Sequence, residues 1–212
     1  MKEQQQRDQF DKAGGKQMKL MIASDIHGSA PCCRKMLEAY VREKADRLLL
    51  LGDILYHGPR NDLPEGYAPK EVIAMLNPVK KNLLCVRGNC DTEVDQMVLD
   101  FPVLADYCLL DLTDGSGDAG AVMFATHGHR YNPHHLPPLS DGDILLNGHT
   151  HIPACEEILD MDGNRYQYLN PGSVSIPKEG SRRSYMIYEK GTFTWKNLEG
   201  EAYQTWKTGS RC

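Results

Sequence analysis

The chain has 212 residues, of which 41% are hydrophobic and 25% are charged, and its formal net charge is −5. These fractions lie near the averages for globular proteins and exclude intrinsically disordered, collagen-like and coiled-coil classes. No apolar run approaches the roughly 20 residues of a membrane-spanning helix, and no Lys/Arg-rich block indicates a dedicated nucleic-acid-binding surface. We therefore expect a domain-sized protein that does not cross a membrane.

Residues 1–17 are dominated by charged and amide side chains. Because such a segment is too polar to order itself, we expect a disordered tail at 1–17 and a single domain at 18–212. The tail has no apolar stretch of the kind found in secretory signals, and the seven cysteines lack zinc-ribbon or redox-motif spacing. We therefore expect a cytoplasmic protein with mostly reduced thiols.

The first half of the domain alternates short apolar runs with helix-like stretches, which is typical of strands joined by crossover helices in an α/β fold. The expected strands are 20–23, 48–51 and 83–86, and the expected helices are 29–45 and 69–77. A further short helix follows Asp91, which we expect to be its cap, with Val94, Met97 and Val98 on its apolar side.

The second half is richer in strand-like segments, joined mainly by turns that contain Gly and Asp. The expected strands are 103–112, 121–125, 144–146, 154–160, 165–169, 185–188 and 192–195. Crossover connections thus dominate early in the domain and hairpins dominate late. This pattern predicts two sheets packed face to face with helices outside.

Residue types that bind metal ions follow five of the expected strands directly. These segments are Asp25-Ile26-His27-Gly28, Gly52-Asp53, Gly88-Asn89-Cys90-Asp91, Thr126-His127-Gly128 and Gly148-His149-Thr150-His151. In α/β sheets, loops beyond the carboxyl ends of the strands gather ligand-binding groups, so the five segments can converge. We expect Asp-x-His and His-x-His to direct two side chains to the same side, because alternate residues of an extended segment do so.

A pair of metal ions explains why these residue types would be needed together. A phosphate ester is anionic, so two cations that neutralise its oxygens and generate hydroxide near neutral pH accelerate its hydrolysis. Such a pair requires a bridging carboxylate, and Asp53 is the natural candidate. Each segment alone is equally consistent with a surface turn or a cap, but their joint occurrence predicts a dinuclear metal site.

The ordered series of ligand segments resembles the calcineurin-like metallophosphoesterases, and the runs SDIHGS, THGH and NPGSVSIPK add to the likeness. The resemblance extends over nearly everything from Met18 onward. It implies a four-layer αββα sandwich, with two mixed β-sheets flanked by helices and the metal site at the strand ends. By the same resemblance, one ion is held by Asp25, His27, Asp53 and His151, and the other by Asp53, Asn89, His127 and His149.

Cys90 departs from the pattern of many family members, which have a histidine there that contacts phosphate and assists the leaving group. A neutral thiol cannot replace an imidazolium in stabilising charge, so we expect weak activity on phosphomonoesters. Cys90 thus occupies a candidate leaving-group position, although a packing role is an equal alternative. Asn89 and His129 are the expected catalytic residues, with a supporting role behind the ligands left open for His129.

The expected function is that of a metal-dependent phosphodiesterase in which a bridging hydroxide attacks phosphorus in line. Mn²⁺ is the preferred ion, and Fe, Zn, Co or Ni remain alternatives. Other functions left open are a protein-interaction scaffold, as in a retromer subunit of similar fold, a phosphomonoesterase and a cyclic-nucleotide phosphodiesterase. The expected partner is a small phosphodiester. Oligomeric state is left open, although small members of the family often self-associate.

Overall fold

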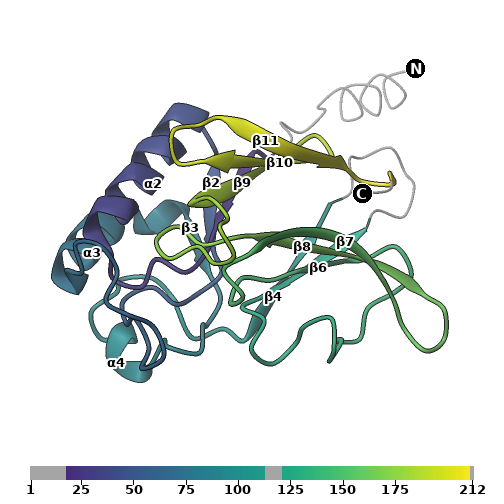
Figure 1. Ribbon diagram of the computed structural model, residues 1–212, viewed down its shortest axis with the longest axis horizontal. Coiled ribbons are helices and arrows are strands. Elements are labelled where there is room, and N and C mark those ends of the chain that lie inside the picture. The colour runs from purple at the N-terminus through teal and green to yellow at the C-terminus, as the bar shows by residue number, and fades with distance from the viewer. Residues whose placement is uncertain (1–17, 113–120, 211–212) are drawn as a thin grey trace, which may run out of the picture.

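The computed structural model describes residues 18–112 and 121–210, so the predicted polar tail at 1–17 lies outside the described residues. Two mixed sheets pack face to face, and helices cover an outer face of one of them (Figure 1). This arrangement confirms the expected α/β class with two mixed sheets and flanking helices. Within the described part of the chain, no helix is long and apolar enough to span a bilayer.

The first sheet contains six strands and the second contains five. The first is built from β1 (Leu20–Ala23), β2 (Arg47–Leu50), β3 (Leu83–Cys85), β9 (Ser184–Glu189), β10 (Thr192–Asn197) and β11 (Ala202–Lys207), in the order β11-β10-β9-β1-β2-β3. The second is built from β4 (Tyr107–Asp111), β5 (Val122–Thr126), β6 (Ile144–Leu146), β7 (Pro153–Leu159) and β8 (Arg165–Pro171), in the order β4-β5-β6-β8-β7.

Burial on both faces explains why β1 and β2 read as continuous apolar runs. On β1, Leu20 and Ile22 pack into the core between the sheets, whereas Met21 and Ala23 pack beneath the helices. Leu49 of β2 packs with Leu20 and Ile22 in the core between the sheets. The alternation of side chains along a strand thus supplies two hydrophobic layers from one short segment.

Helix α2 (Ala30–Glu43) begins with a proline in its first turn, where the missing N–H is tolerated, and ends at Lys44 in the left-handed conformation. Its buried face includes Cys33 and Met36. Helix α3 (Pro69–Leu76) packs beside α2 and continues into the 3₁₀-helix η1 (Asn77–Asn82). Both α-helices cover the first sheet (Figure 1).

The outer face of the second sheet is covered mainly by the connection between β5 and β6. Phe124, Leu145 and Tyr168 on the sheet contact Tyr131 and two leucines of that connection. No helix lies in this layer among the described residues. Because β5 and β6 are parallel neighbours, this connection is a crossover rather than a hairpin, whereas hairpins were expected to dominate in this half of the chain.

One local expectation is wrong, and one strand was not predicted. The helix after residue 91 is only α4 (Glu93–Gln96), capped by Thr92 through a capping box with Asp95, and its expected apolar side is exposed, with Met97 83% accessible. A helix this short has no face to bury. Strand β11 was not predicted, although Trp206 on it packs against Phe193 with ring centroids 5.7 Å apart.

Parallel strands position the predicted ligand segments. Strands β1, β2 and β3 are parallel, and so are β5, β6 and β8. The carboxyl ends of parallel neighbours lie at the same edge of a sheet, so the segments that follow them meet. Because the two sheets face each other, the edges of both contribute to one site.

Glu43 ties helix α2 to the first sheet. Its nearly buried carboxylate accepts hydrogen bonds from Lys196 Nζ at 2.7 Å and Tyr185 Oη at 2.9 Å, and Lys19 Nζ lies 3.5 Å away. Burial alone raises the pKa of Glu43, but Lys196 and Tyr185 lower it below its ordinary value. A carboxyl group whose pKa falls on folding stabilises the native state above the unfolded pKa, and this stabilisation is lost as the pH falls.

We predict that Glu43→Gln lowers the free energy of unfolding at pH 7 by about 1–3 kcal/mol, because charge-assisted hydrogen bonds are weakened. The difference from the unmodified protein should shrink as the pH falls below about 4. Urea unfolding followed by circular dichroism at several pH values measures it. Glu38→Gln, on the exposed face of the same helix, is the matched control. Equal losses in both variants at pH 7 would contradict the prediction.

Candidate metal centre

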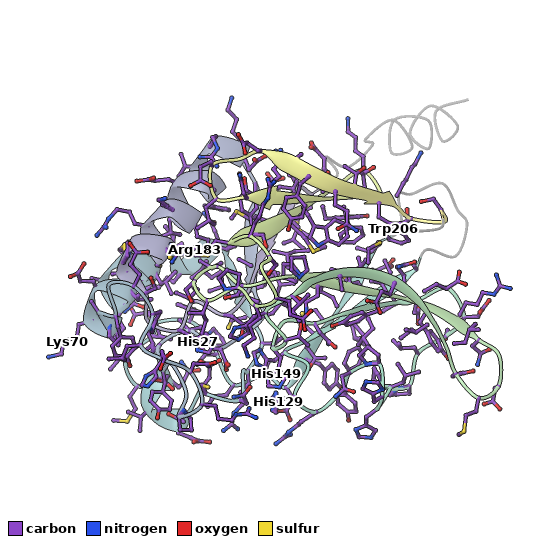
Figure 2. The ribbon with its side chains drawn as sticks, viewed as in Figure 1. His27, Lys70, His129, His149, Arg183 and Trp206 are labelled. Atoms are coloured by element: carbon purple, nitrogen blue, oxygen red, sulfur yellow. The ribbon has the colours of Figure 1, made fainter. Side chains whose placement is uncertain are left out.

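The site lies where the carboxyl ends of the parallel strands of both sheets meet. Figure 2 shows His27, His149 and His129 gathered at this end of the sandwich, with Trp206 at the other end. The structure brings all seven predicted ligands together: Asp25, His27, Asp53, Asn89, His127, His149 and His151. Except for Asn89 and His149, they are buried. Their assignment as metal ligands stays a prediction.

One group of ligand atoms is formed by Asp25, His27 and His151. His151 Nε2 lies 3.2 Å from Asp25 Oδ1, and His27 Nε2 lies 3.5 Å from the same oxygen. The two Nε2 atoms are 3.2 Å apart. Asp25 Oδ1 is buried and has no hydrogen-bond partner in the described part of the chain. Three donor atoms therefore face one point.

A second group is formed around His127. Its Nε2 lies 3.0 Å from Asn89 Oδ1 and 3.1 Å from His149 Nδ1. Asp53 joins the two groups, because its Oδ2 lies 3.6 Å from His27 Nε2 and 3.4 Å from His127 Nε2. The other carboxylate oxygen, Oδ1, accepts the backbone N–H of Cys90 at 2.8 Å. One oxygen of Asp53 is thus left between the two groups.

Backbone carbonyls fix the tautomers of three histidines. Nδ1 of His27 lies 2.8 Å from the carbonyl of Tyr56, and Nδ1 of His151 lies 2.8 Å from that of Ile176. His127 Nδ1 lies 2.7 Å from another backbone carbonyl. Because a carbonyl only accepts, Nδ1 carries the proton and a neutral ring directs its Nε2 lone pair into the site. Metal-binding histidines are typically oriented in this way.

The two carboxylates of the site are held in their charged form. Burial by itself raises the pKa of Asp25, but interactions with His151 and His27 hold it well below its ordinary value. Burial opposes ionisation of Asp53 as well, yet His127 lowers its pKa. The site therefore carries buried negative charge, which must be balanced by cations.

The histidines respond to these carboxylates in opposite ways. Burial lowers the pKa of His127, but Asp53 and Asp25 raise it to about 9. Burial and then His127 lower the pKa of His149 to about 4. In the absence of an ion, the two carboxylates thus favour a proton at His127 Nε2, the atom that a neutral ring would offer to a metal, whereas His149 stays neutral. The site attracts positive charge and presents neutral nitrogen donors beside it.

The donor set fits divalent metal ions. Neighbouring donors within each group are 3.0–3.6 Å apart, which suits ligands about 2.1 Å from a common ion. A donor set that mixes imidazole nitrogen with carboxylate and amide oxygen suits first-row transition metals better than it suits calcium or magnesium, which prefer oxygen donors only. The orphaned Asp25 Oδ1 and the inward lone pairs would both be satisfied by such ions.

The backbone at the ligands is left-handed rather than extended. The residues with positive φ are Asp25 (59°), His27 (48°), Asp53 (54°), His149 (65°) and His151 (64°). The expectation that the two X-x-His pairs act as extended segments is therefore wrong, since β1 ends at Ala23 and β7 begins at Pro153. Tight turns aim these side chains, at a cost of about 1 kcal/mol or more for each residue.

Two serines that the sequence analysis did not assign hold one of these turns. Ser173 Oγ and Ser175 Oγ both donate to the backbone carbonyl of Asp25, each at 2.9 Å. Asn170 holds a second turn, because its Nδ2 donates to the Gly148 carbonyl at 2.7 Å. The sequence feature that could have identified these residues is the polar stretch 170–175, which includes the end of β8 and lies at the same sheet edge as the ligands.

Asp91 was expected to cap a helix but instead ties two ligand segments together. Its carboxylate accepts the backbone N–H groups of Gly88 at 2.7 Å, Asp53 at 2.8 Å and Ile54 at 2.9 Å. A fully buried aspartate is stable there because three donors satisfy it. Gly88 itself must be glycine, since an added Cβ would collide with the Asp53 carboxylate.

Cys90 and His129 lie beside the ligands. Cys90 is buried and accepts a hydrogen bond from Asn89 Nδ2 at 3.1 Å, and burial and Asp53 raise its pKa, so it stays a neutral thiol. The ring centroid of His129 lies 5.5 Å from that of His127 and 6.3 Å from that of His149. Burial and His127 lower the pKa of His129. The catalytic roles of both residues remain predictions.

A cavity of about 380 Å³ opens onto the ligands. Besides Asp53, Asn89, His149 and His151, its lining residues are Arg60, Asn61, Thr150 and Lys178. His57 does not line the cavity, because its ring packs edge-on against Tyr56 and Tyr67 with centroids 4.8 and 5.3 Å away. Arg60 and Asn61, in the loop that follows Asp53, therefore rim the site, and His57 supports that loop.

Comparisons with known proteins find a matching family model and several relatives. The Calcineurin-like phosphoesterase superfamily domain matches residues 18–192. Phosphodiesterase YfcE of Escherichia coli (strain K12) is 49% identical over 168 residues, which cover 79% of this chain and 85% of that protein. Phosphodiesterase MJ0936 of Methanocaldococcus jannaschii is 24% identical over 163 residues, which cover 73% of this chain and 83% of that protein.

Solved structures give the same result. The E. coli YfcE phosphoesterase matches with a TM-score of 0.82 and 43% identity, covering 91% of this chain and 100% of that one. Chaetomium thermophilum Vps29 matches with a TM-score of 0.52 and 16% identity, covering 90% and 99%, and this likeness shows a shared fold alone. By its sequence match over residues 18–192 and its 49% identity to YfcE, this chain belongs to the calcineurin-like phosphoesterase superfamily.

Proposed function

We propose that this protein is a metal-dependent phosphodiesterase that acts on a small phosphodiester. The observation that carries the proposal is Asp53, whose Oδ2 lies between two groups of donor atoms, 3.6 Å from one imidazole nitrogen and 3.4 Å from another. A carboxylate in this position is suited to bridge two cations. The proposal also draws on the 49% identity with a protein named as a phosphodiesterase.

The proposed ligands of one ion are Asp25, His27, Asp53 and His151, and those of the other are Asp53, Asn89, His127 and His149. When bound, two divalent ions neutralise phosphoryl oxygens and make hydroxide available near neutral pH for in-line attack on phosphorus. Mn²⁺ is the preferred ion because the donors mix imidazole with carboxylate and amide oxygen, and Fe, Zn, Co and Ni suit similar donors.

Asn89 and His129 are the proposed catalytic residues of the chain itself. Asn89 directs its carbonyl oxygen at the ligand group and its amide N–H at the Cys90 sulfur, and we propose that this N–H turns to a phosphoryl oxygen when substrate binds. His129 stays neutral near pH 7 because its pKa is lowered. It can therefore donate one N–H to the substrate without adding positive charge.

The alternatives are less well supported. A scaffold of the same fold has no need of seven converging donor residues, and the likeness to Vps29 concerns the fold alone. A phosphomonoesterase must stabilise a dianion, and the neutral Cys90 thiol contributes no positive charge for this. Cyclic nucleotides are themselves phosphodiesters, so a cyclic-nucleotide phosphodiesterase is a special case of the proposed function. Oligomeric state is left open. A cytoplasmic location also stays a proposal, because Cys32, Cys33, Cys85, Cys90 and Cys108 are free thiols whereas Cys155 is disulfide-bonded.

We predict that Asp53→Asn reduces both metal content and phosphodiester turnover, because an amide keeps the acceptor for the Cys90 N–H but removes the negative bridge. Turnover of bis(p-nitrophenyl) phosphate should fall at least about hundredfold. Elemental analysis after dialysis and a chromogenic assay with excess Mn²⁺ measure the two effects. The same change at the exposed Asp162 serves as the control. Full turnover by Asp53→Asn in excess metal would refute the bridging role.

We also predict that the Mn²⁺-loaded protein prefers a diester to a monoester that has the same leaving group. The value of kcat/KM for bis(p-nitrophenyl) phosphate should exceed that for p-nitrophenyl phosphate by about a hundredfold. The reason is that the neutral thiol at position 90 supplies no positive charge to stabilise the additional negative charge of the monoester. Steady-state assays at pH 7, with and without chelator, measure the ratio. A preference for the monoester, or turnover that survives the chelator, would contradict the proposal.

A further inference from the structure

The cavity over the predicted ligands extends past the groups that the proposed chemistry uses. Its volume of about 380 Å³ is within the usual range of about 300–1,000 Å³ for small-molecule sites, so it has room for more than the reacting phosphoryl group. Arg60, Asn61 and Lys178 line the part of the cavity not formed by ligand residues or Thr150. This cationic rim is the part of the cavity that the proposed mechanism leaves unexplained.

The backbone on both sides of the rim is anchored next to the ligands. Gly58 packs onto Cys90, since a Cβ added there would lie 3.0 Å from the Cys90 sulfur. Asn61 closes the same loop by donating from Nδ2 to the His57 carbonyl at 2.8 Å. On the other side, the backbone N–H of Lys178 donates to the carbonyl of the ligand residue His151 at 3.2 Å.

The same segment is braced from its far end. Ser181 donates both its backbone N–H, at 2.9 Å, and its Oγ, at 2.6 Å, to the Lys178 carbonyl. Lys178 thus projects from a turn held on one side by a predicted ligand and on the other by Ser181. The flexible side chains of Arg60 and Lys178 therefore start from fixed points at the cavity mouth.

The charges of Arg60 and Lys178 are not neutralised by the protein. Among the residues that the structure describes, neither side chain forms an ion pair or a hydrogen bond, whereas Arg130 pairs with Asp106 and Arg183 pairs with Glu65. The cavity lining contains a single acid, Asp53, and its carboxylate faces the ligand groups. Unpaired cations at the mouth of a cleft attract anionic ligands.

We propose that Arg60 and Lys178 bind a second phosphate group of the substrate, so that the substrate is a small phosphodiester that also carries a terminal phosphate. This inference rests on the proposed function, which places the reacting phosphoryl group at the metal ligands. A simple diester carries one negative charge, all of it at the reacting phosphorus, and leaves both rim cations without a partner. A terminal phosphate supplies acceptors that guanidinium and ammonium groups bind well.

Binding of two nucleotides that differ only in a second phosphate tests the inference. Isothermal titration calorimetry compares thymidine 5′-monophosphate with thymidine 3′,5′-bisphosphate on the Mn²⁺-loaded protein. The bisphosphate should bind at least about tenfold more tightly, and this ratio should fall about tenfold in the double variant Arg60→Gln/Lys178→Gln. Arg165→Gln and Lys70→Gln remove exposed cations away from the cavity, Lys70 lying on α3 (Figure 2), and should retain the ratio.

An activity measurement separates this inference from the proposed function. Turnover of thymidine 5′-(p-nitrophenyl phosphate) is compared with turnover of the same diester bearing a 3′-phosphate. Equal affinity for the two nucleotides, or a ratio unchanged in the double variant, overturns the phosphate subsite even if both diesters are hydrolysed. Absence of turnover of both diesters overturns the proposed function, while a bisphosphate preference lost in the double variant would still uphold the subsite.

Discussion

The arrangement of this end of the molecule depends on buried negative charge facing inward-directed nitrogen lone pairs. Asp25 and Asp53 remain ionised in a place that water scarcely reaches, and backbone carbonyls force the Nε2 lone pairs of His27 and His151 toward each other at 3.2 Å. Such a cluster is unstable without positive charge at its centre. Hydrogen bonds between the backbone and the side chains of His27, His151 and Asp53 hold these mutually repelling groups in place.

Holding the donors together strains the backbone, and polar residues outside the ligand set support it. Five ligand residues adopt left-handed φ values that non-glycine residues normally avoid. The carboxylate of Asp91, the hydroxyls of Ser173 and Ser175 and the amide of Asn170 each bond to backbone atoms of those turns. Strain concentrated at a functional site and stabilised by its surroundings is a recurrent feature of proteins.

Strands and candidate metal ligands could be predicted from the sequence wherever a residue type has a single physical role. Apolar runs such as 48–51 could be identified as strands because they are buried on both faces, and the residues that bind metals could be found at the strand ends. Backbone conformation was less accessible, since Asp25 and His27 fit an extended pattern equally well. Asp91 was misassigned because its partners are brought near by tertiary structure, and β11 is an edge strand with only a weak alternation.

The ligands come from both sheets, and this has a consequence for the cohesion of the molecule. Asp25, His27, Asp53 and Asn89 follow strands of the first sheet, whereas His127, His149 and His151 follow strands of the second. Each proposed ion would thus fasten one sheet to the other at the open end of the sandwich. Since ligands that bind only the native state stabilise it by mass action, the resistance of this fold to heat would rise with the concentration of free metal.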